Sequence, residues 1–244
     1  MTRILVIGDS CTDVYVYGHC KRLCPDAPVP VFIPDYTIKN GGMARNVQAN
    51  VISLGDKCDL HTHEEDITKT RYVHDTTNQM IMRLDSGEGS VSRVSNLNEI
   101  TWGLYDAVIV SDYNKGFLLP EDIDFICKHH KFVFVDTKKR LGKWVSSCFV
   151  LKINEEEYEK NKAVVEEVGV DHKLIVTLGE RGCSYLQKVY PVRKVDIKDM
   201  TGAGDTFMAA LCSEYMKTRY MVKAIEKANF AATIVVQKRG VCTI

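Results

Sequence analysis

The sequence lacks a net charge. Its 244 residues contain 32 Lys and Arg against 32 Asp and Glu, so no long-range attraction to nucleic acid or to an anionic membrane is expected. No apolar run approaches the roughly 20 residues of a membrane-spanning helix, and no basic-then-apolar signal segment precedes the first apolar run at 3–8. These absences predict a cytoplasmic protein that binds neither nucleic acid nor membrane.

The nine cysteines include no CxxC pair. This spacing argues against a disulfide framework and against a zinc site, and favours reduced thiols that act as small core residues. Cys20 and Cys24 are the closest pair, but no second ligand pair stands at zinc-site spacing. The segment HTHEED at 61–66 contains metal-ligating residue types, although a solvated polar loop is the favoured interpretation.

Apolar, β-branched runs typical of buried strands alternate with helical patterns. Strands are predicted at 3–8, 57–62, 106–111, 132–136, 148–153 and 173–178, and helices at 41–54, 120–130, 155–168 and 204–217. The alternation predicts an α/β fold with a mainly parallel central sheet flanked by helices. Ligands of such sheets bind beyond the carboxyl ends of the strands. The residues at those ends are Asp9, Asp112, Asp136, Asn154 and Gly179.

Three other segments alternate apolar and polar residues and are interrupted by polar turns. They lie at about 13–18, 28–39 and 69–84, and prolines at 25, 28, 30 and 34 favour edge or twisted strands over central ones. We expect a small β lid made of antiparallel ribbons. The lid strands would be inserted in a single domain that spans 1–244.

The segment DMTGAGDTF at 199–207 places glycines directly before a helical pattern. The first amides of a helix have no intrahelical partner and carry partial positive charge, so they bind anions. Gly202 and Gly204, with Ala203 between them, let the backbone approach a ligand closely. Asp205 would lie beside that anion, where it can orient a hydroxyl and take its proton in phosphoryl transfer. An ordinary N-capping aspartate is the structural alternative.

Other nucleotide-binding devices are missing from the sequence. There is no GxxxxGK[ST] loop and no protein-kinase HRD or DFG signature. RLGKW at 140–144 has Trp144 where the hydroxyl residue belongs. A kinase with this sequence must therefore bind its nucleotide in another way.

DMTGAGDTF resembles the C-terminal signature of the ribokinase-like (PfkB) family of carbohydrate kinases. NGGMARNVQANVISLG at 40–55 resembles the N-terminal signature of the same family, and the two occur in the family's order. The resemblance implies a ribokinase-like fold, ATP and Mg²⁺ as cofactors, and ATP-dependent transfer of a phosphoryl group to a sugar hydroxyl. Asp205 would be the base and the 202–205 backbone the anion hole. The family pattern also implies a homodimer formed through the lid strands.

Further segments carry the family's binding residues onto this chain. IGDSCTDVYVYG implies a sugar-binding Asp13, and KINEEEYE implies that Asn154 and Glu157 serve magnesium and phosphate. VTLGERGCSY and KANFAATIVVQKRG resemble the nucleotide site. The nucleotide-binding residues implied are Lys152, Asn154, Thr177, Gly179 and Asn229. The alternative for Lys152 is that it only lies at the end of a strand and does not bind the nucleotide.

Within the family, RLCPDAPVPVF, KTRYV, NQMIMRLD and VSDYNKGFL resemble the heptose 7-phosphate kinase domain of ADP-heptose synthesis. This likeness implies transfer to the C1 hydroxyl of D-glycero-D-manno-heptose 7-phosphate. Carboxylates, amides and backbone would bind the sugar, and cations its phosphate. The substrate-binding candidates are Asp13, Gly41, Gly42, Arg45, Asn46, Lys69, Arg71, Asp112 and Lys115. A solvated surface charge is the alternative for each basic residue taken singly.

One departure from the family pattern is a local shortening. Only HEEDI at 63–67 separates the expected strand 57–62 from the lid segment near 69, whereas the family carries a further helix and strand there. A parallel crossover needs at least about ten residues, so one βαβ unit should be missing near 63–68, leaving apolar surface for a partner subunit. A kinase for another sugar phosphate or a nucleoside, and a degenerate binding protein without turnover, are the alternative functions.

Overall fold

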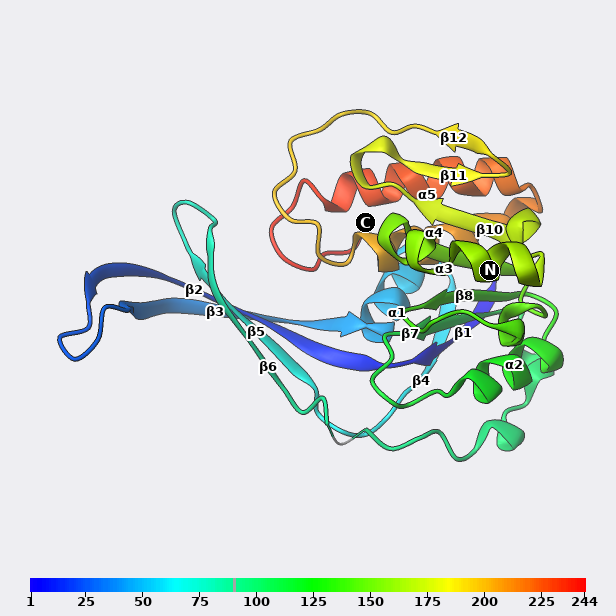
Figure 1. The fold of residues 1–244 in the computed structure, drawn as a ribbon, viewed down its shortest axis with the longest axis horizontal. Coiled ribbons are helices and arrows are strands. Elements are labelled where there is room, and N and C mark those ends of the chain that lie inside the picture. The colour runs from blue at the N-terminus through cyan, green and yellow to red at the C-terminus, as the bar shows by residue number, and fades with distance from the viewer. Residues whose placement is uncertain (90) are drawn as a thin grey trace.

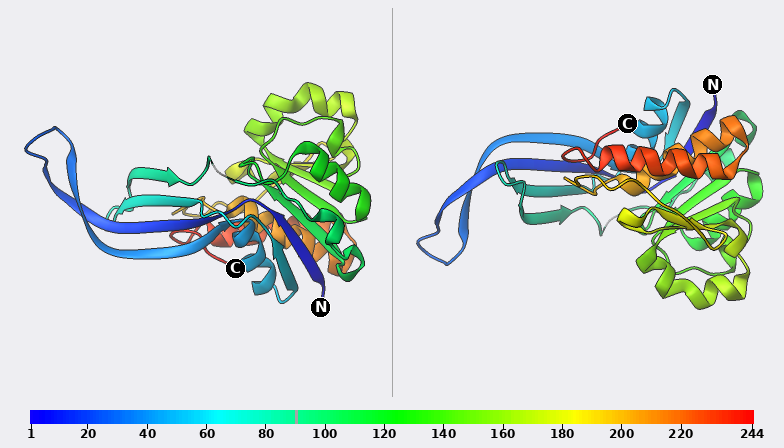
Figure 2. Two further views of the ribbon diagram at one scale, coloured as in Figure 1. Left: turned by 90° about the horizontal axis from the view of Figure 1, so that it is seen from below. Right: turned by 90° about the horizontal axis from the view of Figure 1, so that it is seen from above.

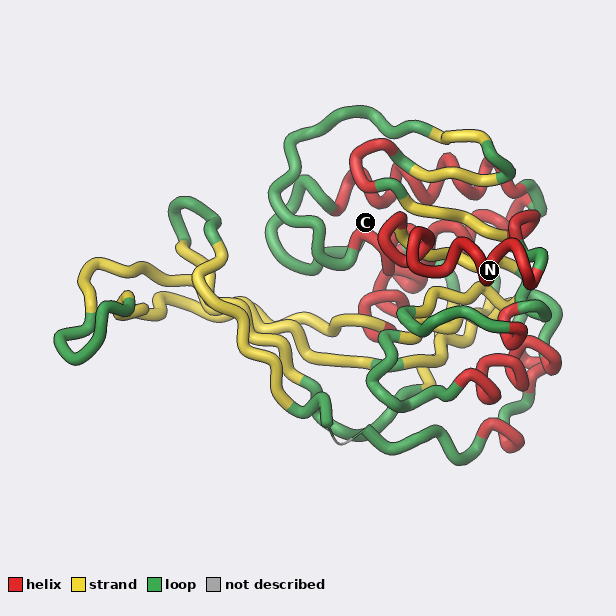
Figure 3. The backbone as a smooth tube through the Cα atoms, in the orientation of Figure 1, coloured by secondary structure: helices red, strands yellow, loops and turns green. Residues whose placement is uncertain are grey.

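Two β-sheets organise the chain, one of eight strands and one of four. The computed structural model describes residues 1–89 and 91–244. Figure 1 shows the four-stranded sheet as a long arm that projects from a body of helices and strands, and the tube in Figure 3 traces the same division. We call the four-stranded sheet the lid sheet.

The eight-stranded sheet has the order β12, β11, β10, β9, β8, β7, β1, β4. Its strands are β1 (Arg3–Gly8), β4 (Lys57–His61), β7 (Ala107–Asp112), β8 (Val133–Thr137), β9 (Val150–Asn154), β10 (Leu174–Thr177), β11 (Cys183–Tyr185) and β12 (Lys188–Tyr190). All pairs from β10 to β4 are parallel, and β11 and β12 pair antiparallel at one edge. The predicted α/β fold with a mainly parallel sheet is confirmed.

Helices cover both faces of this sheet, as Figure 2 shows. The helices are α1 (Ala44–Ser53), α2 (Pro120–His129), α3 (Glu155–Val168), α4 (Ala203–Thr218) and α5 (Met221–Val235). Ile4 and Val6 of β1 enter a core with α1, α4 and α5, whereas Leu5 and Ile7 enter one with α2 and α3. The division follows from the alternation of side chains along a strand. None of the helices in the described part of the chain is both long and apolar enough to cross a membrane.

The lid sheet has the order β3, β2, β5, β6. Its strands are β2 (Ser10–Leu23), β3 (Pro30–Met43), β5 (Thr68–His74) and β6 (Met80–Ser86). β2 pairs antiparallel with β3 but parallel with β5, so the expectation of antiparallel ribbons is wrong for this central pair. In the register, Asp13 lies between Asn40 and Lys69.

The start of α1 differs from the sequence expectation. The helix predicted from 41 begins at Ala44, because Gly41 and Gly42 complete β3. A Cβ on Gly42 would lie 2.0 Å from Oδ2 of Asp13, so only glycine lets β3 pass this side chain. Gly42 therefore serves the approach of two strands, whereas a Cβ on Gly41 would meet Cβ of Arg45 on α1 at 2.8 Å.

The shortened segment connects the two sheets directly. Residues 62–67 form no helix or strand between β4 and β5, and β4 is the last strand of its sheet. The segment is not wholly solvated: the His63 side chain is buried and its Nε2 accepts a hydrogen bond from the Ser10 amide at 3.1 Å. The described residues contain no group of three potential metal-ligating side chains, and Cys20 and Cys24 are free thiols.

Candidate active site

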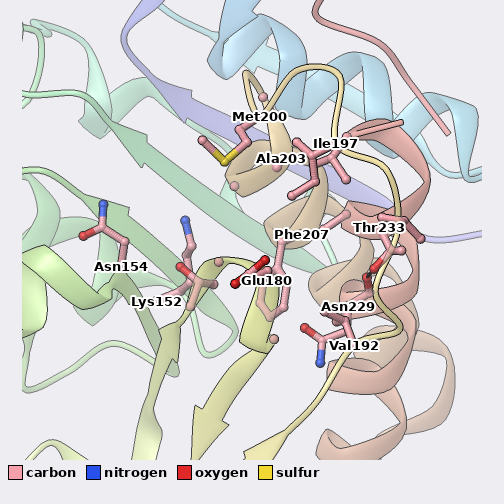
Figure 4. A pocket seen from close by; sticks show the side chains of 18 of the residues that line it. Lys152, Asn154, Glu180, Val192, Ile197, Met200, Ala203, Phe207, Asn229 and Thr233 are labelled. Carbon is pink, nitrogen blue, oxygen red and sulfur yellow. Dashed lines mark hydrogen bonds between the residues drawn. The ribbon is translucent and has the colours of Figure 1, made fainter. Parts of the chain in front are cut away.

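A pocket of about 540 Å³ lies at the carboxyl ends of β8, β9 and β10, beside the start of α4. Figure 4 shows Lys152 and Asn154 of β9 across the pocket from Asn229 and Thr233 of α5. The expected site residues that line it are Lys152, Asn154, Thr177, Gly179, Gly202, Ala203, Gly204 and Asn229. The structure therefore brings the glycine segment and the expected nucleotide-binding residues together.

Asp205 is held at the first turn of α4 by two donors. Nδ2 of Asn46 donates to its Oδ2 at 2.9 Å, and the hydroxyl of Tyr113 donates to its Oδ1 at 2.7 Å. Gly202 precedes the helix with φ 80°, and a Cβ there would lie 2.6 Å from Nδ2 of Asn46. The glycine thus allows the amide of Asn46 to reach the carboxylate.

Burial sets the charge state of Asp205. Its carboxyl is 3% exposed, and burial raises its pKa to about 6, against the lowering effect of the bonds from Asn46 and Tyr113. The carboxylate of Asp136 adds to the rise, and the ammonium of Lys152 opposes it. A carboxyl with such a pKa is ionised at neutral pH and binds a proton readily, which suits a general base.

Lys152 and Asp136 form a buried ion pair at the same end of the pocket. Nζ of Lys152 donates to Oδ2 of Asp136 at 2.7 Å, and both residues line the pocket. A Cβ on Gly204 would lie 3.0 Å from Nζ. Gly204 therefore lets the ammonium approach the first turn of α4, where unpaired amides and a cation jointly favour a phosphate.

Asn154, which follows Lys152 on the same wall of the pocket, caps the start of α3. Oδ1 of Asn154 accepts from the Glu157 amide, and Glu157 accepts in return from the Asn154 amide, each at 2.8 Å. The other oxygen of Glu157 accepts from Nζ of Lys138 at 2.5 Å. This capping box fixes the helix start. It also occupies the oxygens expected to serve magnesium.

One other carboxylate oxygen in the pocket fits a cation. Oδ1 of Asp136 is buried without a hydrogen-bond partner among the described residues. Magnesium in kinases is usually bound by one or two carboxylates, several waters and the substrate phosphates. The oxygen of Asp136 fits that coordination without sharing a hydrogen bond, whereas the oxygens of Asn154 and Glu157 each already accept one, within the helix cap or from Lys138.

On the lid side, Asp13 forms a buried ion pair with Arg71. Nη1 of Arg71 donates to Oδ1 of Asp13, and the two side chains are 6% and 5% exposed. The guanidinium also lies 5.1 Å from the ring centre of Tyr15. Among the described residues, the hydrogen-bond donor to Oδ2 of Asp13 is the weak donor Sγ of Cys11, at 3.7 Å, so this oxygen keeps acceptor capacity for a sugar hydroxyl.

The expected phosphate-binding cations differ in their surroundings. Lys69 is buried, its Nζ lies 5.5 Å from the ring centre of Tyr113, and burial with the charges of Lys115 and Arg83 lowers its pKa. Nζ of Lys115 pairs with Glu88 at 2.6 Å. Arg45 is half-buried on α1, near Gly41. Of these cations, Lys69 is the one that contacts Tyr113, whose hydroxyl donates to the base.

Asp112 faces away from the pocket into an internal network. Its Oδ1 accepts from Nζ of Lys139 at 2.9 Å, and its Oδ2 from Thr137 at 2.5 Å. Both oxygens are bound within this network and the residue is only 1% exposed, so its carboxylate does not line the pocket. The next residue, Tyr113, reaches Asp205 instead.

The sequence analysis did not name Tyr113 or Lys138 as site residues, and it named Asp136 only as a residue at a strand end, without a role. All three line the pocket. Tyr113 directly follows β7, and Asp136 lies near the carboxyl end of β8. Their positions could have identified both residues, since ligands bind at such strand ends. The sequence alone does not distinguish Lys138 from the neighbouring basic residues Lys139 and Arg140.

Residues 98–244 match the family model described as pfkB family carbohydrate kinase. The chain belongs to this family. The match spans more than half of the chain, including the glycine segment with Asp205. The family expected from the two signatures is confirmed, and this membership agrees with the expected enzyme class, an ATP-dependent carbohydrate kinase.

Curated relatives extend the likeness over almost the whole chain. The bifunctional protein HldE of Helicobacter pylori (strain J99) is 33% identical over 295 positions, covering 98% of this chain and 64% of that protein. HldE of Hydrogenovibrio crunogenus is 28% identical over 296 positions, covering 100% and 61%. The chain spans less than two thirds of these relatives. Both alignments have more positions than its 244 residues, so the relatives contain residues without a counterpart here.

Solved structures establish the fold. The ribokinase of Thermotoga maritima superposes with a TM-score of 0.73 at 18% identity, covering 99% of this chain and 95% of that one. The nucleoside kinase of Methanocaldococcus jannaschii gives 0.71 at 17% identity, covering 99% and 93%. The ribokinase-like fold expected from the two signatures is confirmed.

Proposed function

We propose that this pfkB-family kinase transfers the γ-phosphoryl group of ATP to the C1 hydroxyl of D-glycero-D-manno-heptose 7-phosphate. The single observation that carries the transfer is the position of Asp205, a buried carboxyl between the pocket at α4 and the base of the lid sheet. The heptose specificity is supported by the segments that resemble heptose 7-phosphate kinases, and by the similarity to HldE proteins.

In this proposal ATP occupies the pocket, with its phosphates at the start of α4. The amides of the first turn and Nζ of Lys152 would balance the negative charge that develops on the transferred group. Thr177, Gly179 and Asn229 line the part of the pocket left for the nucleoside. Magnesium, bound with the ATP phosphates, would neutralise their charge, and Oδ1 of Asp136 is available to it beside the expected residues Asn154 and Glu157.

The sugar would lie between the lid sheet and Asp205. Asp13 accepts from sugar hydroxyls, and Asp205 accepts the proton of the attacking hydroxyl as the bond to phosphorus forms. On the lid sheet, Lys69 of β5 lies opposite Asp85 of β6, and Arg71 lies opposite Arg83. Lys69 and Lys115 would bind the 7-phosphate. The substrate phosphate needs only this local cluster of cations, which agrees with a chain that carries no net charge.

A homodimer through the lid is part of the proposal. The face of the lid sheet opposite Asp13 contains two sets of residues that pair across β2, β5 and β6. One set is Val14, Thr70 and Leu84, and the other is Val16, Tyr72 and Met82. Met82 and Leu84 are each 52% exposed. A second copy would cover this apolar face, because two lids can meet by the same surface in a symmetric pair. A cytoplasmic location agrees with the free thiols of all nine cysteines.

The test is ATP consumption with a panel of acceptors: heptose 7-phosphate, unphosphorylated heptose, another sugar phosphate and a nucleoside. We expect turnover on heptose 7-phosphate, with a 1-phosphate product seen by ³¹P NMR. Asp205→Asn should lower kcat by about 100- to 10,000-fold, while the exposed Asp171→Asn serves as control.

Lys69→Gln tests the substrate phosphate separately. It should raise KM for the phosphorylated sugar by about tenfold, because a charge-assisted hydrogen bond is lost, and leave KM for ATP unchanged. Turnover on a nucleoside alone would replace the heptose assignment with that of a nucleoside kinase. Nucleotide binding without turnover on any acceptor would indicate a binding protein.

A further inference from the structure

Tyr113 connects the catalytic base to both halves of the site. Its hydroxyl donates to Oδ1 of Asp205 at 2.7 Å. Its ring centre lies 5.5 Å from Nζ of Lys69 on the lid sheet and 5.8 Å from Nζ of Lys138 beside the pocket. Two ammonium groups near the ring of a half-buried tyrosine both attract it, which restrains its hydroxyl at the carboxylate.

The backbone of Tyr113 is also held in place. Oδ2 of Asp9, a residue only 1% exposed, accepts from the amide of Tyr113 at 2.8 Å and from the amide of Lys115 at 3.2 Å. Asn114, between them, has φ 58°. The turn after β7 is thus fixed by a carboxylate at the end of β1, and the tyrosine is placed before any substrate binds.

We propose that Tyr113 is a positioning residue that acts through Asp205, keeping this buried carboxyl ionised and oriented for the incoming hydroxyl. The inference rests on the function proposed above, because it assigns Tyr113 a part in the base step of that reaction. A carboxylate offers about four acceptor sites. Tyr113 and Asn46 occupy one on each oxygen, and they leave acceptor capacity for the sugar.

The direction of the effect follows from the charge. A hydrogen bond donated to an ionised carboxylate stabilises the ionised form, whereas burial disfavours it. Burial, then the Asp205 charge, raises the pKa of the Tyr113 hydroxyl well above its ordinary value, so the hydroxyl keeps its proton and remains a donor. Without this donor, Asp205 would remain protonated to a higher pH and would accept no proton from the sugar.

The experiment is Tyr113→Phe, which keeps the ring between the two lysines and removes only the donor. In protein labelled with ¹³C at the aspartate carboxyl, the resonance missing from Asp205→Asn identifies Asp205. We expect its titration midpoint to rise by about one pH unit in Tyr113→Phe. Tyr220→Phe, at a residue 60% exposed, is the matched control and should leave the midpoint in place.

Kinetics give the second measurement. In Tyr113→Phe the acid limb of the kcat profile should move to higher pH by the same amount as the titration, with KM for ATP unchanged. An unmoved midpoint, with activity reduced equally at every pH, would overturn the positioning role and leave Tyr113 a packing residue. If the wild type turns over no acceptor, the proposed function fails, yet the titration still decides whether Tyr113 controls Asp205.

Discussion

Lys152 and Asp136 face each other across adjacent parallel strands, in direct register, and form a buried ion pair of 2.7 Å. The two side chains are 3% and 6% exposed. The free energy needed to remove the two charges from water offsets much of the attraction between them. Because the ion pair contributes little net stability and lines the pocket at α4, its position points to a role beyond stability.

Substitutions at this pair should separate stability from catalysis. Lys152→Met leaves a buried carboxylate unpaired and should destabilise the fold by about 3–5 kcal/mol in urea unfolding. The double variant Lys152→Met with Asp136→Leu should recover most of that stability, because no unpaired charge remains. Turnover should stay at least about 100-fold below wild type in both. Recovery of activity with stability would contradict a phosphate-binding role for Lys152.

The raised pKa of Asp205 has a consequence for stability. The carboxyl titrates near an ordinary value in the unfolded chain and at about 6 in the folded one. Between these values the folded protein binds the extra proton, so stability falls as pH rises through this window and stays lower above it. At neutral pH the cost is about 3 kcal/mol.

Asp205→Asn should therefore be more stable than wild type at about pH 8, and the difference should shrink towards about pH 4. The measurement is urea unfolding of both proteins across this range. Asp171→Asn, on the surface, should track the wild type at each pH. A constant difference between Asp205→Asn and wild type would show that Asp205 does not titrate within the window.

Gly42→Ala tests the approach of β3 to Asp13. Its Cβ would lie 2.0 Å from Oδ2 of Asp13, so either the strand or the carboxylate with its Arg71 partner must shift. We expect KM for the sugar to rise by about tenfold or more, since a misplaced acceptor loses its hydrogen bond. The nucleotide pocket lies apart from this contact, and ATP affinity measured by calorimetry should be kept.

The control for this variant is Gly103→Ala, where a Cβ would meet no atom within 4 Å. Its kinetics should match those of wild type. Equal losses of sugar and nucleotide affinity in Gly42→Ala would instead indicate a general folding defect.

The proposed lid dimer predicts an effect of charge on the exposed apolar face. Met82→Glu should shift the protein towards monomer in sedimentation velocity, because a carboxylate buried between two apolar faces has no partner. Leu104→Glu changes a leucine of the body that is 54% exposed, and it should leave the oligomeric state as in wild type. Sedimentation of the wild-type protein as a monomer at high concentration would contradict the proposed lid dimer.

Much of the body could be predicted from local sequence. The β-branched runs at 3–8 and 173–178 became β1 and β10, and the pattern at 155–168 became α3 with the same bounds. Buried parallel strands read as apolar runs, and helices read as a 3.6-residue period, so neither needs knowledge of distant contacts. The site at the strand ends and the helix start at Ala203 follow from the same local signals.

Only the tertiary structure decided which polar side chains meet. The sequence by itself determined the α/β class, the glycine segment and Asp205. It placed Asp112 in the site, whereas folding turns that carboxylate inward to Lys139 and brings Tyr113 to the base. It also assigned the lid antiparallel pairing, but β2 and β5 run parallel. Strand partners and side-chain contacts between residues far apart in the chain depend on packing that no local pattern records.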